Sequence, residues 1–389
     1  MRLTPGRWPA IVLTYFFGVL GSASLSKLIP LQVDYATHLG ITPAGFGLLL
    51  AALTLAPALF ASVGGSLSDR FGARPTLIAA ALCGALVNLL YLFASASLHF
   101  YVLRVLEGCV LVGAYSAAPA LIMATTQGRR RSQAMSFWST YTPVGISVGL
   151  LLSSQFAGTA HWRGGYALHA TLFAALTVAG LLLPDRPASA QAAAPRGASG
   201  LFDAWRQPGP LRIALCFGLL VIMGFGVSTV FPGWYARQQG MSIGSASSLL
   251  ATLNLIMVLG GLLTATALGR GVAPLRLLML LAVLGVSAGS LLFWPGSPQQ
   301  LGLFALGLWL LASGASTAAI TSSLPMVLAD PSRGAAAAGL LSQIAALSTF
   351  FTPQLWLSLA AHDAWQGFVA IIVTCWLLTL WAFPLRAKA

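Results

Sequence analysis

The sequence predicts an all-α polytopic membrane protein with twelve transmembrane helices in two pseudo-symmetric six-helix bundles. Hydrophobic residues make up 58% of the 389 residues and charged residues only 7%, whereas soluble domains carry about 25% charged residues. The apolar residues form repeated long runs, and a run of about 20 residues is the length of a helix that crosses a bilayer. The two halves of the chain also share features at an offset near 200 residues, which indicates an internal duplication.

Twelve apolar runs predict the twelve spans, because backbone groups in lipid must be hydrogen-bonded within their own segment. The runs are continuous rather than alternating in polarity, which argues against transmembrane β-strands. They cover residues 11–33, 42–66, 76–95, 100–125, 133–156, 162–183, 211–235, 243–268, 275–294, 301–327, 334–359 and 365–385.

One long polar interruption, rich in Ala, Pro and Gly, separates the first six spans from the last six. Such a composition is typical of a flexible linker. We therefore expect an N-terminal bundle over residues 1–184, a cytoplasmic linker over 185–210 and a C-terminal bundle over 211–389. Three matches in the same order support the duplication: Gly64-Gly65 with Gly260-Gly261, Arg131 with Arg333, and Trp162 with Trp365.

The net charge of +13 raises the possibility of nucleic-acid binding, but the distribution of the charge argues against it. If the N-terminus is cytoplasmic, sixteen basic residues fall in inner segments and only Arg163 and Arg237 fall in outer loops. The positive-inside rule produces this asymmetry. The arginine- and alanine-rich composition fits a bacterial protein, so we expect a multi-pass inner-membrane protein with both termini cytoplasmic.

Other function classes find little support in the sequence. The four cysteines lack the spacing of metal or redox motifs, and no phosphate-binding loop is present, so no metal, cofactor or ATP-driven step is expected. The five histidines are scattered without acidic neighbours, which argues against the rival class, a membrane-embedded enzyme. No soluble domain is present that would suit a sensor or adaptor. The expected partners are a small-molecule substrate and the bilayer, and the expected assembly is a monomer.

A charged hairpin joins the second and third spans, and it reads Gly65-Ser-Leu-Ser-Asp69-Arg70-Phe-Gly72-Ala-Arg74-Pro. This stretch closely resembles the signature loop between helices two and three of the major facilitator superfamily of secondary transporters. The resemblance covers the whole chain. It implies two parallel six-helix halves with a binding site between them near the bilayer midplane.

The resemblance also implies a gating role for the hairpin residues Gly65, Asp69, Arg70, Gly72 and Arg74. In the family, the acid at the position of Asp69 closes the cytoplasmic side by contacting the start of the eleventh span, which here lies near Pro331–Gly334. A carboxylate is stabilised at the N-terminus of a helix. The second-half copy has Ala265 near the place of Asp69, so the latch would be one-sided. A turn that sets topology without gating is the alternative.

Arg104 and Glu107 lie inside the fourth span, three residues apart and therefore on one helix face. Charges within a span are costly and normally face a cavity or a partner. An arginine followed by glycines, here Gly108 and Gly113, resembles a second motif of the superfamily that is linked to proton coupling. This interpretation makes Glu107 the proton carrier, and a structural Arg104–Glu107 pair is the alternative.

Lys27 lies in the first span, three residues before Pro30 and at about the depth of Arg104 and Glu107. Many drug/proton antiporters of the superfamily carry an acid near this position. The first and fourth spans line the cavity in the family, so the three residues are expected to form a cluster of formal charge +1 that favours an anionic solute. A Lys27–Glu107 ion pair without a ligand role and a lysine that snorkels to the surface stay open. Asp34 is expected at the outer boundary, and the sequence does not decide whether Asp34 or Glu107 carries the proton.

Aromatic and amide side chains complete the candidate cavity, although each one also fits a packing role. The candidates are Tyr15, Tyr115, Trp138 and Tyr141 in the first half and Asn254, Trp309 and Gln343 in the second. Together they would give an amphiphilic cavity. The fifth span has Pro143, Gly145 and Gly149 but lacks the Gly-Pro pair of the antiporter signature.

These observations predict a secondary active transporter that works by alternating access. The expected substrate is a small organic solute, anionic or amphiphilic, moved with proton coupling and with export favoured. Uptake of a small organic anion, as in cyanate-permease-like relatives, is the alternative.

Overall fold

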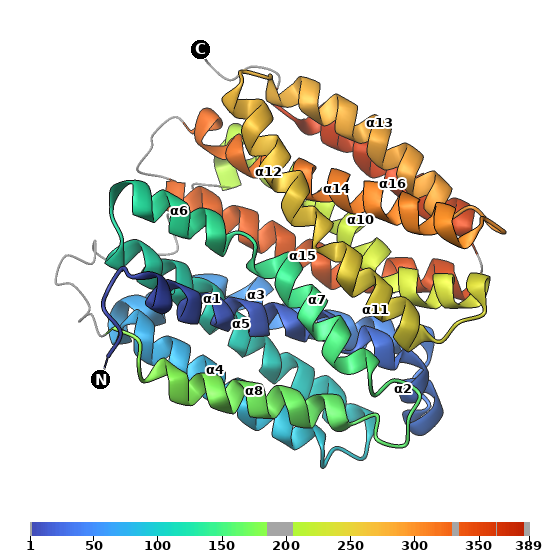
Figure 1. Cartoon of the computed structure of the whole chain (residues 1–389), viewed down its shortest axis with the longest axis horizontal. Coiled ribbons are helices and arrows are strands. Elements are labelled where there is room, and N and C mark those ends of the chain that lie inside the picture. Colours follow the sequence, from blue (N-terminus) through green and yellow to red (C-terminus); the bar gives the residue numbers. More distant parts are fainter. Residues whose placement is uncertain (1, 185–204, 329–333, 363, 385–389) are drawn as a thin grey trace. The chain divides into compact units, whose positions relative to one another are not determined.

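The computed structural model describes residues 2–184, 205–328, 334–362 and 364–384, and these fold into helices joined by short turns (Figure 1). The predicted all-helical fold is confirmed. The helices group into two compact units. The first unit holds the six spans of the first half together with Ile243–Ala251, and the second unit holds the remainder of the second half.

The first unit begins with a helix that is interrupted once and then continues through five further spans. Its elements are α1 (Trp8–Ser26), the 3₁₀ turn η1 (Ile29–Leu31), α2 (Gln32–Leu39), α3 (Pro43–Phe71), α4 (Ala73–Tyr91), α5 (Ser97–Thr125), α6 (Gly128–Trp138), α7 (Tyr141–Ser154) and α8 (Gly164–Gly180).

The second half repeats this plan of long helices and short turns. Its elements are α10 (Pro208–Gln239), α11 (Ile243–Asn254), α12 (Ile256–Gly269), α13 (Pro274–Leu292), α14 (Gln299–Ser322), the 3₁₀ turn η2 (Leu324–Val327), α15 (Gly334–Ala361) and α16 (Trp365–Ala382). The predicted linker, 185–210, lies mostly outside the described residues, and its last three residues already belong to α10.

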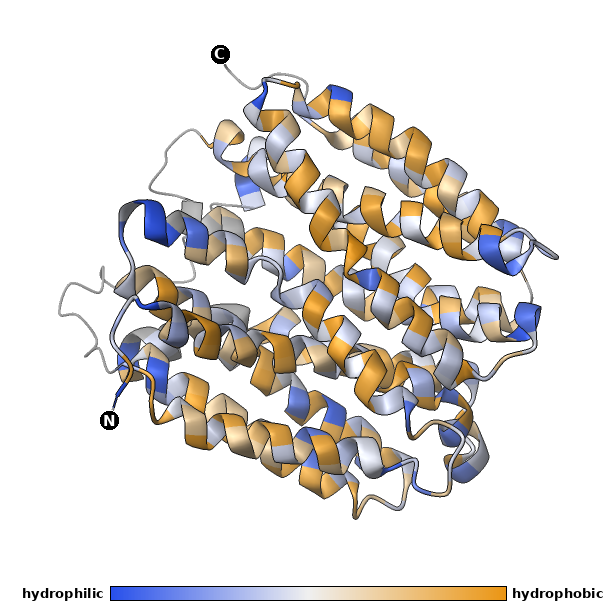
Figure 2. Cartoon of the chain, viewed as in Figure 1, coloured by the Kyte–Doolittle hydropathy of each residue, from blue (hydrophilic) through white to orange (hydrophobic). Residues whose placement is uncertain are grey.

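Within the described residues, ten helical segments are long and apolar enough to cross a membrane. Figure 2 shows the same pattern, because most of the hydrophilic colour lies at helix ends and turns. Two of the twelve predicted spans are not among these ten segments. The span 133–156 is divided between α6 and α7, and the span 162–183 corresponds to α8, which has 17 residues.

Prolines account for the breaks in the first and fifth spans. Pro143 has no N–H to donate to the carbonyl of Ser139, and its ring collides with that carbonyl in a continuous helix. Pro30 stands in the same relation to Ser26, the last residue of α1. The predicted first span is therefore an α-helix, a 3₁₀ turn and a second short helix rather than one continuous rod.

Glycines with positive φ close equivalent turns in the two halves. Gly72 (φ 92°) joins α3 to α4, and Gly271 (φ 83°) lies between α12 and α13. Gly40 (φ 61°) ends α2, and Gly240 (φ 65°) ends α10. Glycine adopts these angles without steric cost. The offsets of about 200 residues support the duplication that the sequence indicates.

Small residues bring neighbouring helices of the first unit close together. A Cβ on Gly145 would lie 2.4 Å from the carbonyl oxygen of Val19, and one on Gly149 would lie 2.3 Å from that of Ala23. The crossing of α1 and α7 therefore depends on these two glycines, as small residues at four-residue spacing predict. Gly108 has the same role between α5 and α3, where a Cβ would lie 2.3 Å from the carbonyl oxygen of Leu53.

We predict that Gly108→Ala destabilises the first unit, because its methyl group would collide with backbone rather than with a movable side chain. Overpacking of this kind costs ~1–3 kcal/mol. Thermal unfolding of the purified protein in detergent measures the loss. Gly224→Ala in α10 is the matched control, since nothing lies within 4 Å of its added methyl. Equal stability of the two variants would contradict the close crossing of α3 and α5.

Candidate functional site

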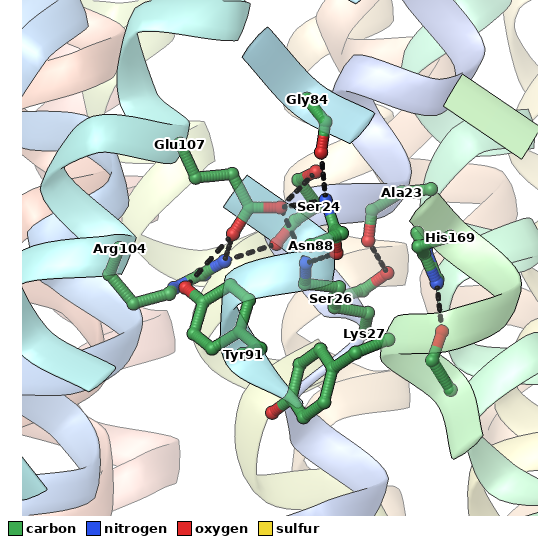
Figure 3. Close-up of polar contacts among 12 residues, drawn as sticks. Ala23, Ser24, Ser26, Lys27, Gly84, Asn88, Tyr91, Arg104, Glu107 and His169 are labelled. Carbon is green, nitrogen blue, oxygen red and sulfur yellow. Dashed lines mark hydrogen bonds and ion pairs between the residues drawn. The ribbon is translucent and has the colours of Figure 1, made fainter. Parts of the chain in front are cut away.

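The break in the first span places Lys27 at the end of α1. The Lys27 backbone N–H still donates to the Ala23 carbonyl at 3.0 Å, so the helix ends in regular geometry. The side chain then enters the space among α1, α4 and α5, where it meets Glu107 (Figure 3). The prolyl break at Pro30 thus fixes the position of a buried ammonium group.

Glu107 is the centre of the site, and both of its carboxylate oxygens accept several hydrogen bonds. Oε1 accepts from Ser24 Oγ at 2.7 Å and from Lys27 Nζ at 2.5 Å, with Asn88 Nδ2 at 3.5 Å. Oε2 accepts from Arg104 Nη1 at 2.9 Å and from Tyr91 OH at 3.2 Å. The charge cluster, as we call it, consists of Ser24, Lys27, Asn88, Tyr91, Arg104 and Glu107.

Arg104 connects Glu107 to the backbones of two other helices. Its Nη1 also donates to the Ser24 carbonyl at 2.9 Å, and its Nε donates to the Leu49 carbonyl in α3 at 3.3 Å. A cation near the C-terminal end of a helix is favoured by the helix dipole, and Ser24 lies in the last turn of α1. Arg104 Nη2 is buried and has no recorded acceptor.

Aromatic rings enclose the Lys27 ammonium. Its Nζ lies 4.9 Å from the centroid of the Tyr91 ring and 5.2 Å from that of the Tyr166 ring, and the two rings stack at 4.6 Å. The Tyr166 and Tyr35 hydroxyls are hydrogen-bonded to each other. Cation–π attraction supplies a further stabilisation of a buried ammonium group.

The charged side chains of the cluster are not exposed at the surface of the first unit. Lys27, Arg104 and Glu107 are each 0% exposed. The structure thus brings together the three residues that the sequence placed in one cluster. It also gives the geometry of the Lys27–Glu107 ion pair, the alternative in which the lysine has no ligand role. The ammonium does not face an open cavity, so its charge is not presented directly to a solute.

The sequence analysis missed several residues that contact or surround this cluster. These residues are uncharged, and they lie on α1, α4 and α8, whose contacts with one another the sequence does not show. Asn88 accepts from Lys27 Nζ at 2.5 Å and donates to the Gly84 carbonyl at 2.8 Å. An asparagine within an apolar run was the available signal. His169, one of the five histidines that the sequence analysis found scattered, is completely buried in α8 and donates through Nδ1 to the Gly165 carbonyl at 2.9 Å.

Asp34 lies apart from the cluster, on α2. Both of its carboxylate oxygens accept from the Gly158 N–H at 3.1 Å, and its backbone carbonyl accepts from His38 Nδ1 at 3.0 Å. Gly158 has φ 69° and belongs to the turn between α7 and α8. Asp34 therefore ties α2 to this turn. Its position at the outer boundary stays a prediction.

The four predicted aromatic residues of the first half form a second group, which we call the aromatic face. Trp138 and Tyr141 stack at 4.3 Å, and the ring of Tyr115 lies 5.0 Å from that of Tyr141. Tyr15 stacks on Phe137 and bonds to Thr140 Oγ1 at 3.0 Å. Tyr115 and Tyr141 are half-buried, whereas Tyr15 and Trp138 are buried.

The three candidates of the second half occupy different helices. Asn254 is buried at the end of α11, next to the break at Leu255. Trp309 is buried in α14 and packs on Gly289 of α13. Gln343 in α15 is half-buried, and its Oε1 accepts from Trp205 Nε1 at 3.3 Å. Their part in binding stays a prediction.

The predicted gate is only partly described. The surroundings of Gly65, the side chain of Asp69 and the segment 331–333 lie outside what the structure describes. Arg70 is exposed beside Phe71. Arg74 donates to the Gly180 and Leu181 carbonyls at 3.5 and 2.9 Å, so it holds the end of α8 within its own unit.

We predict that the two buried ion-pair partners differ in how much their loss destabilises the protein. Glu107→Gln leaves two buried cations without a carboxylate, and breaking a buried pair in this way costs ~3–5 kcal/mol. Lys27→Met costs less, because the remaining Arg104–Glu107 pair is neutral overall. Unfolding of both purified variants in detergent measures the difference. Equal losses would show that net charge does not control the stability of the cluster.

Comparison with known proteins places this chain in a family. The sequence model of the Major Facilitator Superfamily matches residues 11–386. A solved structure of a bacterial homolog to the human lysosomal transporter Spinster, inward-facing and occupied, superposes with a TM-score of 0.79 and 13% identity, covering 98% of this chain and 97% of that one. A D-xylose–proton symporter gives a TM-score of 0.76 and 16% identity, covering 97% and 98%.

Curated relatives match over shorter stretches. The chain is 34% identical over 143 residues to the class B tetracycline resistance protein of Escherichia coli, which is 36% of this chain and 32% of that protein. It is 28% identical to NarK2 of Mycobacterium tuberculosis, described as a probable nitrate/nitrite transporter, covering 61% of this chain and 64% of that one. It is 26% identical to the multidrug resistance protein MdtH of Aeromonas hydrophila, covering 61% and 62%. The chain thus spans between about a third and just under two thirds of the length of these three relatives. The family model, in contrast, matches nearly the whole of this chain. The chain belongs to the Major Facilitator Superfamily of transporters.

Proposed function

We propose that this protein is a proton-coupled exporter of amphiphilic, ring-bearing organic solutes. It works as a monomer in a bacterial inner membrane with both termini cytoplasmic. Solute binds at the aromatic face of the first unit, and the charge cluster couples its movement to protons. Alternating access moves the solute across the bilayer.

The observation that carries the proton coupling is the charge cluster itself. The three charged side chains of the cluster are completely buried in a protein with only 7% charged residues. Buried charges in a membrane protein are costly and mark ion or proton pathways by default. Coupling through the cluster gives a functional reason for this cost.

The aromatic face supports an amphiphilic solute over a purely anionic one. Tyr115 and Tyr141 combine half-buried rings with hydroxyl groups, and the Tyr115 hydroxyl already bonds to Ser22 Oγ at 2.8 Å. Such sites favour flat apolar bodies with a few polar groups. Lys27, the basis for expecting an anion, is neutralised by Glu107 within a sealed site. Similarity to the tetracycline and multidrug resistance proteins favours export of such solutes.

Uptake of a small anion is the second candidate. The cluster keeps a formal charge of +1, from two cations and one carboxylate, and the similarity to NarK2 covers 61% of the chain. A cation-rich region raises the local concentration of anions. This candidate requires a conformation in which the cluster opens to solute.

Reconstitution into proteoliposomes tests the proposal. An imposed pH gradient is expected to drive accumulation of tetracycline, and an ionophore that collapses the gradient is expected to abolish it. Nitrate and cyanate serve as the anionic probes. Gradient-driven movement of these anions without movement of any aromatic amphiphile in a panel would overturn the export proposal in favour of the second candidate.

We predict that Tyr141→Ala weakens binding of aromatic amphiphiles about tenfold, because the stacking surface of the aromatic face is lost. Tyr141→Phe keeps the ring and is expected to retain most of the affinity. Thermal-shift titration of the purified protein measures both. Phe93→Ala is the control, since Phe93 is 75% exposed. Equal affinities in all of these variants would place the solute elsewhere.

We further predict that Glu107→Gln abolishes gradient-driven transport while solute exchange across the membrane continues. The variant removes the carboxylate that holds both buried cations, so the cluster loses its coupling role. Counterflow in proteoliposomes without a pH gradient measures the exchange. Full gradient-driven transport by this variant would remove Glu107 and its cluster from the coupling mechanism.

A further inference from the structure

We propose that Lys27, and not Glu107, is the group in the charge cluster that releases and takes up the coupled proton. The inference rests on the proposed proton coupling and assigns its carrier. Glu107 then remains a permanent carboxylate that serves as counter-ion to Arg104. The argument depends on net charge and on hydrogen-bond capacity.

The net charge of the cluster limits which proton can move. With Lys27 and Arg104 protonated and Glu107 ionised, the formal charge is +1 within a fully buried space. Adding a proton to Glu107 raises this charge to +2, which a low-dielectric interior opposes. Removing a proton from Lys27 lowers it to zero. Arg104 keeps its proton in either case.

The hydrogen bonds of Glu107 also favour a permanent carboxylate. Five donors surround its two oxygens at 2.5 to 3.5 Å. A protonated carboxyl group carries a donor of its own, so one of these neighbours would have to turn away. The Lys27, Asn88 and Arg104 nitrogens cannot accept from it. The Ser24 and Tyr91 hydroxyls could accept only by turning their own hydrogens away from Glu107.

Lys27 is matched by its surroundings in both protonation states. Its Nζ has two recorded acceptors, Asn88 Oδ1 and Glu107 Oε1. A neutral amine has two N–H groups and can still donate to both. The third N–H of the ammonium faces the Tyr91 and Tyr166 rings, where the contact is cation–π in character. Loss of one proton therefore leaves no acceptor of the site unsatisfied.

Every other titratable group around Lys27 is less suited to the exchange. His169 on α8 donates through Nδ1, and its Nε2 is buried without a recorded partner, but protonating it would also raise the charge to +2. Ionising Tyr91 on α4 would set a phenolate against the Glu107 carboxylate at 3.2 Å. The Tyr166 and Tyr35 hydroxyls, on α8 and α2, are hydrogen-bonded to each other. Figure 3 shows the charge cluster with His169 beside it.

The step itself is a simple proton transfer. When a conformational change admits water to the cluster, the Nζ–H bond of Lys27 breaks, the electron pair stays on nitrogen and water takes the proton as hydronium. The amine recovers a proton from water of the other compartment later in the cycle. Lys27 follows the last residue of α1 at a prolyl break, so bending of the first span is the motion that would expose it.

Lys27→Arg tests the assignment, because arginine keeps the charge and the donors but does not release a proton. Wild-type protein in detergent is expected to release about one proton for each tetracycline bound. Lys27→Arg is expected to release none and to bind with an affinity that no longer changes with pH. Tyr101→Phe, which alters a hydroxyl of α5 that bonds to the Gly45 carbonyl, is the control. Proton release and gradient-driven transport that persist in Lys27→Arg would overturn the assignment.

A second measurement on the wild-type protein needs neither a variant nor a solute. Infrared difference spectra recorded across a pH titration are expected to show no protonated-carboxyl C=O band from a buried site. Such a band, if it is lost in Glu107→Gln, would identify Glu107 as the carrier. If the wild-type protein moves no protons with any solute, the proposed function is refuted. The infrared spectra would still show whether Glu107 is ionised or protonated in the cluster.

Discussion

The Glu107 carboxylate is the interaction on which the first unit depends. It accepts from side chains of α1, α4 and α5 and from the lysine at the end of α1. A buried carboxylate needs cations and hydrogen-bond donors around it, or the cost of removing it from water is not offset. The break in the first span, the position of Lys27 and the contacts of Arg104 with the backbones of α1 and α3 all satisfy this one requirement.

The arrangement separates two tasks within one bundle. The charge cluster is enclosed and is held mainly by α1, α4 and α5, whereas the aromatic face lies on α1, α5, α6 and α7 and keeps two half-buried tyrosines. Helix α1 and helix α5 contribute to both. In the proposed mechanism, a change in the charge of the cluster would act on the same two helices that carry Tyr15 and Tyr115, and coupling would take this route.

Arginines donate to backbone carbonyls at or just beyond the ends of helices α4, α8 and α16. Arg74 holds the end of α8, Arg212 donates to the Ala382 carbonyl at 2.7 Å, and Arg163 donates to the Ala94 carbonyl at 2.8 Å. The last carbonyls of a helix lack partners within it, and a guanidinium satisfies them and complements the helix dipole. Arg163, which the sequence analysis assigned only to topology, and Arg74, which it assigned to the gate, thus also hold parts of the first unit together.

Hydropathy and glycine-punctuated turns are local properties of the chain, so they were enough to predict the membrane fold and the family. The sequence also identified Lys27, Arg104 and Glu107, since charges are conspicuous in apolar runs. Only the tertiary structure decided what these charges contact. Asn88, Tyr91 and Tyr166 come from helices that no spacing rule connects to Lys27. Whether a buried charge is paired or presented to solute depends on such non-local contacts.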